Sequence, residues 1–147
     1  MYTKILIPSD GSANAARAAE QAKDLLKLNP SAKATVVFVH HIVAEYHNYK
    51  WGEVEHPLGK EMSAKVKAAE EAAVGAIRAS FEKAGLAIES KVLTGNAADV
   101  IVKLAEAEGY DLIVMGSRGL SEITGLIVGS VSERVLHLAK CPVLIVK

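Results

Sequence analysis

Residues 112–119 read Leu112-Ile113-Val114-Met115-Gly116-Ser117-Arg118-Gly119, and nine further residues separate Gly119 from Gly129-Ser130. The apolar first half predicts a buried strand, and the glycines after it predict a tight turn. In α/β proteins, a strand that leads through a glycine-rich turn to a helix start exposes a row of backbone N–H groups to phosphate. The stretch therefore favours a nucleotide-binding α/β fold, although glycine-rich turns also occur without any ligand.

The helix start is predicted at Ser130-Val131-Ser132-Glu133, which matches the capping-box pattern. In that pattern Ser130 is the N-cap and the Glu133 side chain reaches back to its N–H group. The hydroxyl groups of Ser130 and Ser132 would then be able to donate hydrogen bonds to phosphate oxygens. The Arg118 guanidinium either contacts the phosphates as well or lies in solvent.

Strands and helices alternate along the rest of the chain. Apolar runs predict strands at 4–8, 34–42, 86–93, 111–115 and 142–146, and helical periodicity predicts helices at 13–28, 64–84, 97–108 and 131–138. This alternation predicts one domain over residues 1–147, an open doubly wound parallel sheet with helices on both faces. If the first strand is central, the loops after Pro8 and Met115 face one crevice at the carboxyl ends of the strands, where such folds bind ligands.

Asp10 follows the first strand and precedes the first helix. A short carboxylate at this place can cap an N–H group of the helix start, at Ala13 or a neighbour. Alternatively, its oxygens can accept hydrogen bonds from ribose hydroxyls while backbone amides elsewhere hold phosphate. The sequence leaves both roles open.

Composition excludes several classes of partner. Lys plus Arg and Asp plus Glu both number 17, so the net charge is zero and no basic cluster predicts nucleic-acid binding. No apolar run approaches the roughly 18 residues of a membrane span, and the first residues do not read as a signal peptide. We therefore expect a cytoplasmic protein, in which the single Cys141 is a buried structural thiol.

The middle of the chain does not predict a metal site. His40 and His41 are adjacent in a predicted strand and so point to opposite faces, and no cysteine lies near them, His47 or His56. The stretch 44–58 is expected to be a long connection that carries Tyr46, Tyr49 and Trp51. It serves as a lid or partner surface, or as a loop without a role.

The last strand, Val143-Leu144-Ile145-Val146, is apolar on both faces and is expected at the outer edge of the sheet. An exposed edge of this kind favours pairing with a second strand. Antiparallel pairing with its copy across a twofold axis would give a homodimer. The alternative is that a helix of the same chain covers the strand.

Five segments together resemble one known family. They are Ile5-Leu6-Ile7-Pro8-Ser9-Asp10-Gly11-Ser12, Phe38-Val39-His40-His41, Thr94-Gly95, Asp111-Leu112-Ile113-Val114-Met115 with the spacing Gly116-x2-Gly119-x9-Gly129-Ser130, and Cys141-Pro142-Val143-Leu144-Ile145-Val146. Over residues 4–147 the chain resembles the universal stress proteins (UspA-like). The glycine spacing is similar to the G-2x-G-9x-G-S motif of the family's ATP-binding branch.

This resemblance implies a fold, a ligand and a set of site residues. The fold is a five-stranded sheet in order 3-2-1-4-5, Rossmann-like and similar to adenine nucleotide alpha hydrolases. The implied ligand is ATP, AMP or ADP, with or without Mg²⁺. The implied role is in stress response or signalling, and such proteins are often homodimers. The implied nucleotide-binding residues are Pro8, Ser9, Asp10, His41, Met115, Gly116, Arg118, Gly119, Gly129, Ser130, Val131 and Ser132.

Within that set, the resemblance assigns Asp10 to the ribose and the backbone around His41 to the adenine edge. Met115 and Gly116 line the sugar, and residues Gly119 and 129–132 surround the phosphates. Family members commonly have an apolar residue where this chain has His41. The resemblance assigns the adenine contact to backbone atoms, which this change of side chain leaves in place.

Two other functions compete with nucleotide binding alone. The first is a slow ATP-hydrolysing or phosphotransfer enzyme on the same site. The chain has no Gly-x4-Gly-Lys-Ser/Thr loop and no lysine in the glycine-rich segment to reach the terminal phosphates, so we do not expect an efficient ATPase. The second is a flavodoxin-like domain, which takes phosphate at the loop after its first strand and not after its fourth.

Overall fold

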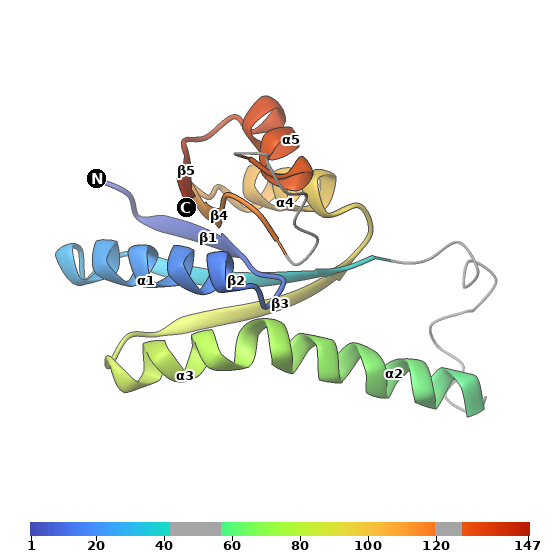
Figure 1. Cartoon of the computed structure of the whole chain (residues 1–147). Helices are drawn as coiled ribbons and strands as arrows, with labels where there is room; N and C mark the ends of the chain where they lie inside the picture. The colour runs from blue at the N-terminus through green and yellow to red at the C-terminus, as the bar shows by residue number, and fades with distance from the viewer. Residues whose placement is uncertain (42–56, 120–127) are drawn as a thin grey trace.

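The computed structural model describes residues 1–41, 57–119 and 128–147 (Figure 1). The strands are β1 (Lys4–Pro8), β2 (Lys33–His40), β3 (Ile88–Thr94), β4 (Leu112–Gly116) and β5 (Val143–Val146). The helices are α1 (Ala13–Leu28), α2 (Pro57–Glu70), the π-helical turn η2 (Glu71–Gly75), α3 (Ala76–Lys83), α4 (Ala97–Glu108) and α5 (Ser130–Leu138). Within these residues no helix is long and apolar enough to cross a membrane.

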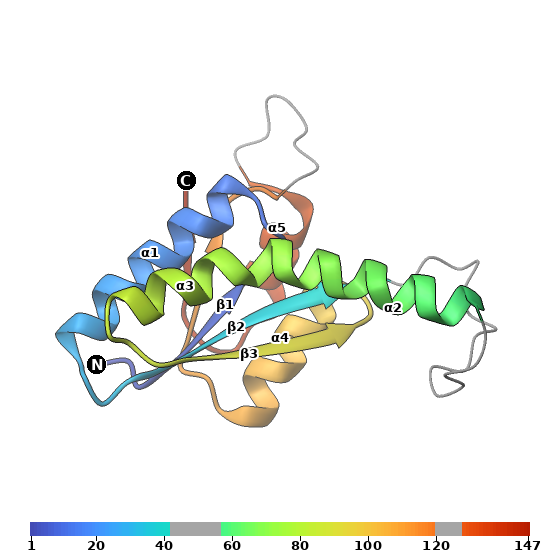
Figure 2. The ribbon, with the colours of Figure 1, turned by 90° about the horizontal axis from the view of Figure 1, so that it is seen from below.

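The strands form one parallel sheet in the order β3-β2-β1-β4-β5, with β1 at its centre. The predicted fold is confirmed. Helices α1 and α3 lie on one face of the sheet, with α2 running on from α3 beyond the carboxyl ends of the strands, and α4 and α5 lie on the other face (Figures 1 and 2). Strand order reverses between β1 and β4, so the loops that follow these two strands meet at the carboxyl edge of the sheet.

Two apolar layers hold the helices to the sheet. On one face, Ile5 and Val36 pack with alanines of α1 and with Phe81 of α3. On the other face, Leu6 and Val37 pack with Ile101 of α4 and Val135 of α5. Because alternate residues of the central strands enter opposite layers, these strands are buried on both sides, as expected for a parallel sheet.

The helix expected at 64–84 is longer and less regular than predicted. It begins at Pro57, so the end of the connection expected at 44–58 belongs to α2, and residues 44–56 lie outside the described residues. A π-helical turn at Glu71–Gly75 interrupts it. There the Ala73 carbonyl accepts a hydrogen bond from the Ser9 hydroxyl at 2.5 Å. The helix is thus tied to the end of β1, a contact that periodicity did not reveal.

The predicted capping box of α5 is wrong. Ser130 is the first helical residue, Gly129 is the N-cap, and no side chain caps this end. The reason is that the Gly129 carbonyl already accepts the Glu133 N–H at 2.9 Å, while the Gly129 N–H donates to the Ser117 carbonyl at 2.6 Å. The chain therefore turns into the helix one residue earlier than the pattern indicated. Helices α1 and α4 do have side-chain caps, at Ser12 and Asn96.

Two expectations about the carboxyl end have different outcomes. Strand β5 is the outer strand beside β4, as predicted, and Leu144 on it is 38% exposed. Cys141, predicted to be a buried structural thiol, is only half-buried, because it packs at the margin of the α4 and α5 layer. This burial raises the pKa of the thiol.

Candidate functional site

A cavity of about 110 Å³ lies at the carboxyl ends of β1 and β4, where the strand order reverses. Its walls come from the loop after β1, the turn after β4, the carboxyl half of β2, and the first turns of α1, α4 and α5. The lining residues are Pro8, Ser9, Asp10, Ser12, Ala15, Val37, Val39, Ala97, Ile101, Met115, Gly116, Arg118, Gly119, Val131 and Ser132. The structure thus brings together the two loops that the sequence placed in one crevice.

Nine of the twelve predicted site residues line this cavity: Pro8, Ser9, Asp10, Met115, Gly116, Arg118, Gly119, Val131 and Ser132. Gly129 and Ser130 are not lining residues, although they lie beside Val131 at the start of α5. His41 does not line the cavity either and is exposed just beyond the end of β2.

Asp10 belongs to the loop after β1 and faces the turn after β4. Its Oδ1 accepts a hydrogen bond from the Ser12 N–H at 3.0 Å, so the carboxylate does bind a backbone amide at the start of α1. The N-cap itself is Ser12, whose hydroxyl accepts from the Ala15 N–H at 3.1 Å. Asp10 Oδ2 faces Gly119, where an added methyl group would stand 2.2 Å away. One carboxylate oxygen thus stabilises its own loop, and the other faces the glycine-rich turn.

Two serines of the predicted site use their hydroxyl groups within the fold. The Ser9 hydroxyl donates to Ala73 and accepts the Gly11 N–H at 3.2 Å. The buried Ser132 hydroxyl donates to the Gly116 carbonyl at 2.7 Å. A hydroxyl has one proton to donate, and Ser132 uses it here within the fold, so its expected hydrogen bond to phosphate stays a prediction. Its role here is to join the start of α5 to the end of β4.

Gly116 is required for packing. A methyl group there would stand 2.7 Å from Asn14 Cβ and 2.8 Å from the Asn14 carbonyl carbon, closer than real side chains approach. Helix α1 therefore passes directly over the end of β4, and the narrow passage admits only glycine. The first glycine of the predicted phosphate motif is therefore explained by packing against α1.

Arg118 carries the main electrostatic feature of the cavity. The residue is half-buried and lines the cavity wall. Its Nε atom is the single buried side-chain nitrogen or oxygen, among the described residues, that has no hydrogen-bond partner. An unsatisfied buried donor on a cation is costly, and an anion in the cavity would remove that cost.

Sequence reasoning missed six lining residues: Ser12, Ala15, Val37, Val39, Ala97 and Ile101. Most of them are apolar and had been counted only as core or helix positions. Their positions in the chain could have revealed them, because each lies near the carboxyl end of a predicted strand or in the first two turns of the helix that follows a strand. All of them except Ser12 add apolar side chains to the lining of the cavity.

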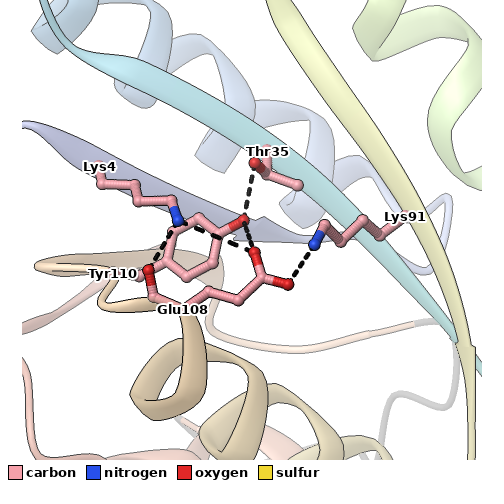
Figure 3. A network of polar contacts seen from close by, with 5 residues as sticks. All are labelled: Lys4, Thr35, Lys91, Glu108 and Tyr110. Atoms are coloured by element: carbon pink, nitrogen blue, oxygen red, sulfur yellow. Dashed lines mark hydrogen bonds and ion pairs between the residues drawn. The ribbon is translucent and has the colours of Figure 1, made fainter.

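The other polar network of note lies at the opposite, amino edge of the sheet (Figure 3). Glu108 at the end of α4 is bound by Lys91 of β3 and by Lys4 of β1, and the Tyr110 hydroxyl donates to Thr35 at 2.8 Å. Lys91 holds the pKa of Glu108 below its usual value, and burial raises the pKa of Tyr110. All these groups satisfy one another, so the network fastens α4 to the sheet.

No group of three His, Cys, Asp or Glu side chains able to hold a metal ion occurs in the part of the chain that the structure describes. His47 and His56, which the sequence considered in this connection, lie outside that part.

Comparison with known proteins shows the family to which this chain belongs. The model of the universal stress protein family matches residues 1–147. The chain belongs to that family. The universal stress protein MJ0531 of Methanocaldococcus jannaschii is 35% identical over 149 residues, which cover 100% of this chain and 83% of the relative. Universal stress proteins of this kind are named for stress and not for an enzymatic activity.

Solved structures of the family share the fold. The structure of protein MJ0577, also of Methanocaldococcus jannaschii, superimposes with a TM-score of 0.78 at 30% identity and covers 100% of this chain and 96% of that chain. A universal stress protein solved in complex with cAMP has a TM-score of 0.70 at 27% identity, with 99% and 97% coverage.

Proposed function

We propose that this universal stress protein binds an adenine nucleotide, ATP or AMP, in the cavity between the loops after β1 and β4. It acts as a nucleotide-dependent protein of stress response or signalling and not as an enzyme. The observation that carries the proposal is Arg118, whose Nε is buried on the cavity wall without a partner. A phosphate oxygen is the acceptor that this donor lacks.

The remaining groups of the cavity suit the rest of a nucleotide. Asp10 Oδ2 accepts from the ribose hydroxyls, because it faces the turn and lies at a strand end. The phosphates lie against Gly119 and residues 129–132, near the N–H groups in the first turn of α5, which have no partner within the helix. The apolar wall formed by Val37, Val39 and Ile101 packs against the sugar or base.

The size of the cavity limits how much of the ligand it encloses. Its volume of about 110 Å³ is below the roughly 300–1,000 Å³ of typical ligand pockets. The nucleotide therefore extends beyond it, with the adenine toward the end of β2 and the backbone of His41. The cAMP bound by one structural relative supports an adenine nucleotide as the class of ligand.

We also propose that the protein is a homodimer through the outer edge of β5. Val143 and Ile145 pack inward against the α4 and α5 layer, while Leu144 on the other face is 38% exposed. An outer strand with exposed apolar side chains favours pairing with its own copy.

A titration with AMP and with adenosine tests the nucleotide proposal. Arg118→Gln removes the charge that would meet the phosphate, so AMP affinity should fall roughly 10-fold or more while adenosine affinity stays nearly unchanged. Arg134→Gln is the matched control, because Arg134 is an exposed arginine of α5 that pairs with Asp99 away from the cavity. Equal AMP affinity for wild type and Arg118→Gln would contradict the proposed phosphate site.

A further inference from the structure

Ser117 follows the last residue of β4 and is only 2% exposed. Each of its polar groups has a partner on a different element. Its N–H donates to the Val146 carbonyl of β5 at 2.8 Å, and its carbonyl accepts from Gly129 at the start of α5 at 2.6 Å. Its hydroxyl accepts from the Asn14 side chain of α1 at 3.3 Å. Ser117 thus joins three elements immediately before Arg118.

Asn14 is an unusual residue for its position. It lies in the first turn of α1, is 5% exposed, and turns its side chain toward the sheet among the alanines that form the buried face of this helix. A buried amide is costly unless it is hydrogen-bonded. Its Nδ2 donates to Ser117, and its Cβ marks the place where α1 comes nearest to Gly116.

The backbone around Arg118 is thereby fixed from two sides. The start of α5 lies against it, since a methyl group on Gly129 would stand 3.4 Å from both Arg118 Cα and the Ser117 carbonyl oxygen. The Asn14 side chain holds the preceding residue from the α1 side. Without the bond to Ser117, backbone contacts alone would set the direction in which the Arg118 side chain leaves the turn.

We propose that Asn14, acting through the Ser117 hydroxyl, is a positioning residue of the nucleotide site. It fixes the turn after β4 so that Arg118 reaches the phosphate, without touching the ligand itself. This inference rests on the proposed function, since it assumes a phosphate at Arg118. A buried hydrogen bond serves this role better than an apolar contact because its direction is defined.

The test compares AMP and adenosine affinities of wild type, Asn14→Ala, Ser117→Ala and the double variant. Each single change should weaken AMP roughly 3- to 10-fold and adenosine much less. The double variant should lose no more than the larger single loss, because both changes remove the same bond. Ser117→Ala removes only the hydroxyl oxygen, so we expect this variant to fold. It therefore tests the proposal even if Asn14→Ala does not fold.

The control is the hydroxyl pair of Tyr110 and Thr35 at the amino edge of the sheet, which is also buried and hydrogen-bonded (Figure 3). Tyr110→Phe and Thr35→Val should lower the melting temperature without changing AMP affinity, as expected of a purely structural bond. Unchanged AMP affinity in folded Ser117→Ala, or equal losses for AMP and adenosine, would overturn the positioning role. A wild-type protein that binds neither ligand would instead overturn the proposed function.

Discussion

Replacing Gly119 by alanine separates the role of Asp10 in binding from its role in the fold. A methyl group at Gly119 would stand 2.2 Å from Asp10 Oδ2, whereas ordinary contacts begin near 3.4 Å. The carboxylate must therefore move by more than 1 Å. Gly119 does not have the positive φ that requires glycine, and the atom in its way is the far end of a side chain. We expect the free energy of unfolding to change by less than about 1 kcal/mol.

The effect on binding should be much larger. If Asp10 Oδ2 accepts a ribose hydroxyl, displacing it removes a hydrogen bond to a charged group, worth about 1.5–3 kcal/mol. AMP affinity, measured by isothermal titration calorimetry, should therefore fall roughly 10- to 100-fold.

Gly75→Ala provides a closely matched control. A methyl group there would stand 2.2 Å from Glu71 Oε1, also a carboxylate oxygen, but Gly75 lies in η2 and does not line the cavity. This variant should bind AMP as wild type does. A folded Gly119→Ala protein with wild-type affinity for AMP would refute the assignment of Asp10 to the ribose.

Three further predictions follow from other contacts. Asp10→Ala should abolish any preference for AMP over 2′-deoxy-AMP, and equal losses for the two ligands would show that Asp10 acts in the fold, as in its bond to Ser12, and not on the ribose. Ile145→Pro should give a monomer in sedimentation experiments, because the Pro142 carbonyl bonds to Ile113 of β4, the Val146 carbonyl bonds to Ser117 just after it, and alternation turns the Ile145 N–H outward; a wild-type protein that is already a monomer would contradict the dimer. At Asp111, burial raises the pKa, but the bonds donated by Thr3 and by the Lys4 N–H lower it more, so its pKa lies below the usual value. That stabilisation is complete above about pH 4 and is lost as the pH falls below it; Asp111→Asn should cost about 1 kcal/mol in urea unfolding at pH 7 and progressively less below pH 4, and a cost independent of pH would contradict this reading.

The architecture could be predicted from the sequence because periodicity and strand–helix alternation are strong signals in this chain. The apolar run 112–115 and the helical stripe of 13–28 appear as β4 and α1, and the resemblance supplied the strand order. The local irregularities of the helices could not be predicted in this way. The π-helical turn at Glu71–Gly75 holds the Ala73 carbonyl that bonds to Ser9, 64 residues away, and no local pattern contains that contact.

The sequence predicted in outline which residues meet in the cavity, but it did not predict the hydrogen bonds among them. The sequence placed Asp10 and Gly119 in one crevice, and both line the cavity, but it did not reveal that the Ser132 hydroxyl bonds to the Gly116 carbonyl. It also gave Asn14 no role, because a polar residue in a helical pattern does not reveal which buried group it meets. Cytoplasmic location, the dimer and the contacts of His41 stay predictions.

The central claim is that the protein binds an adenine nucleotide. Native mass spectrometry of freshly purified protein, before and after addition of ATP or AMP, tests it most directly. We expect a folded species that carries the mass of one adenine nucleotide per chain, and loss of that species in Arg118→Gln. A protein that retains FMN, or that stays free of ligand at millimolar ATP and AMP, would contradict the claim.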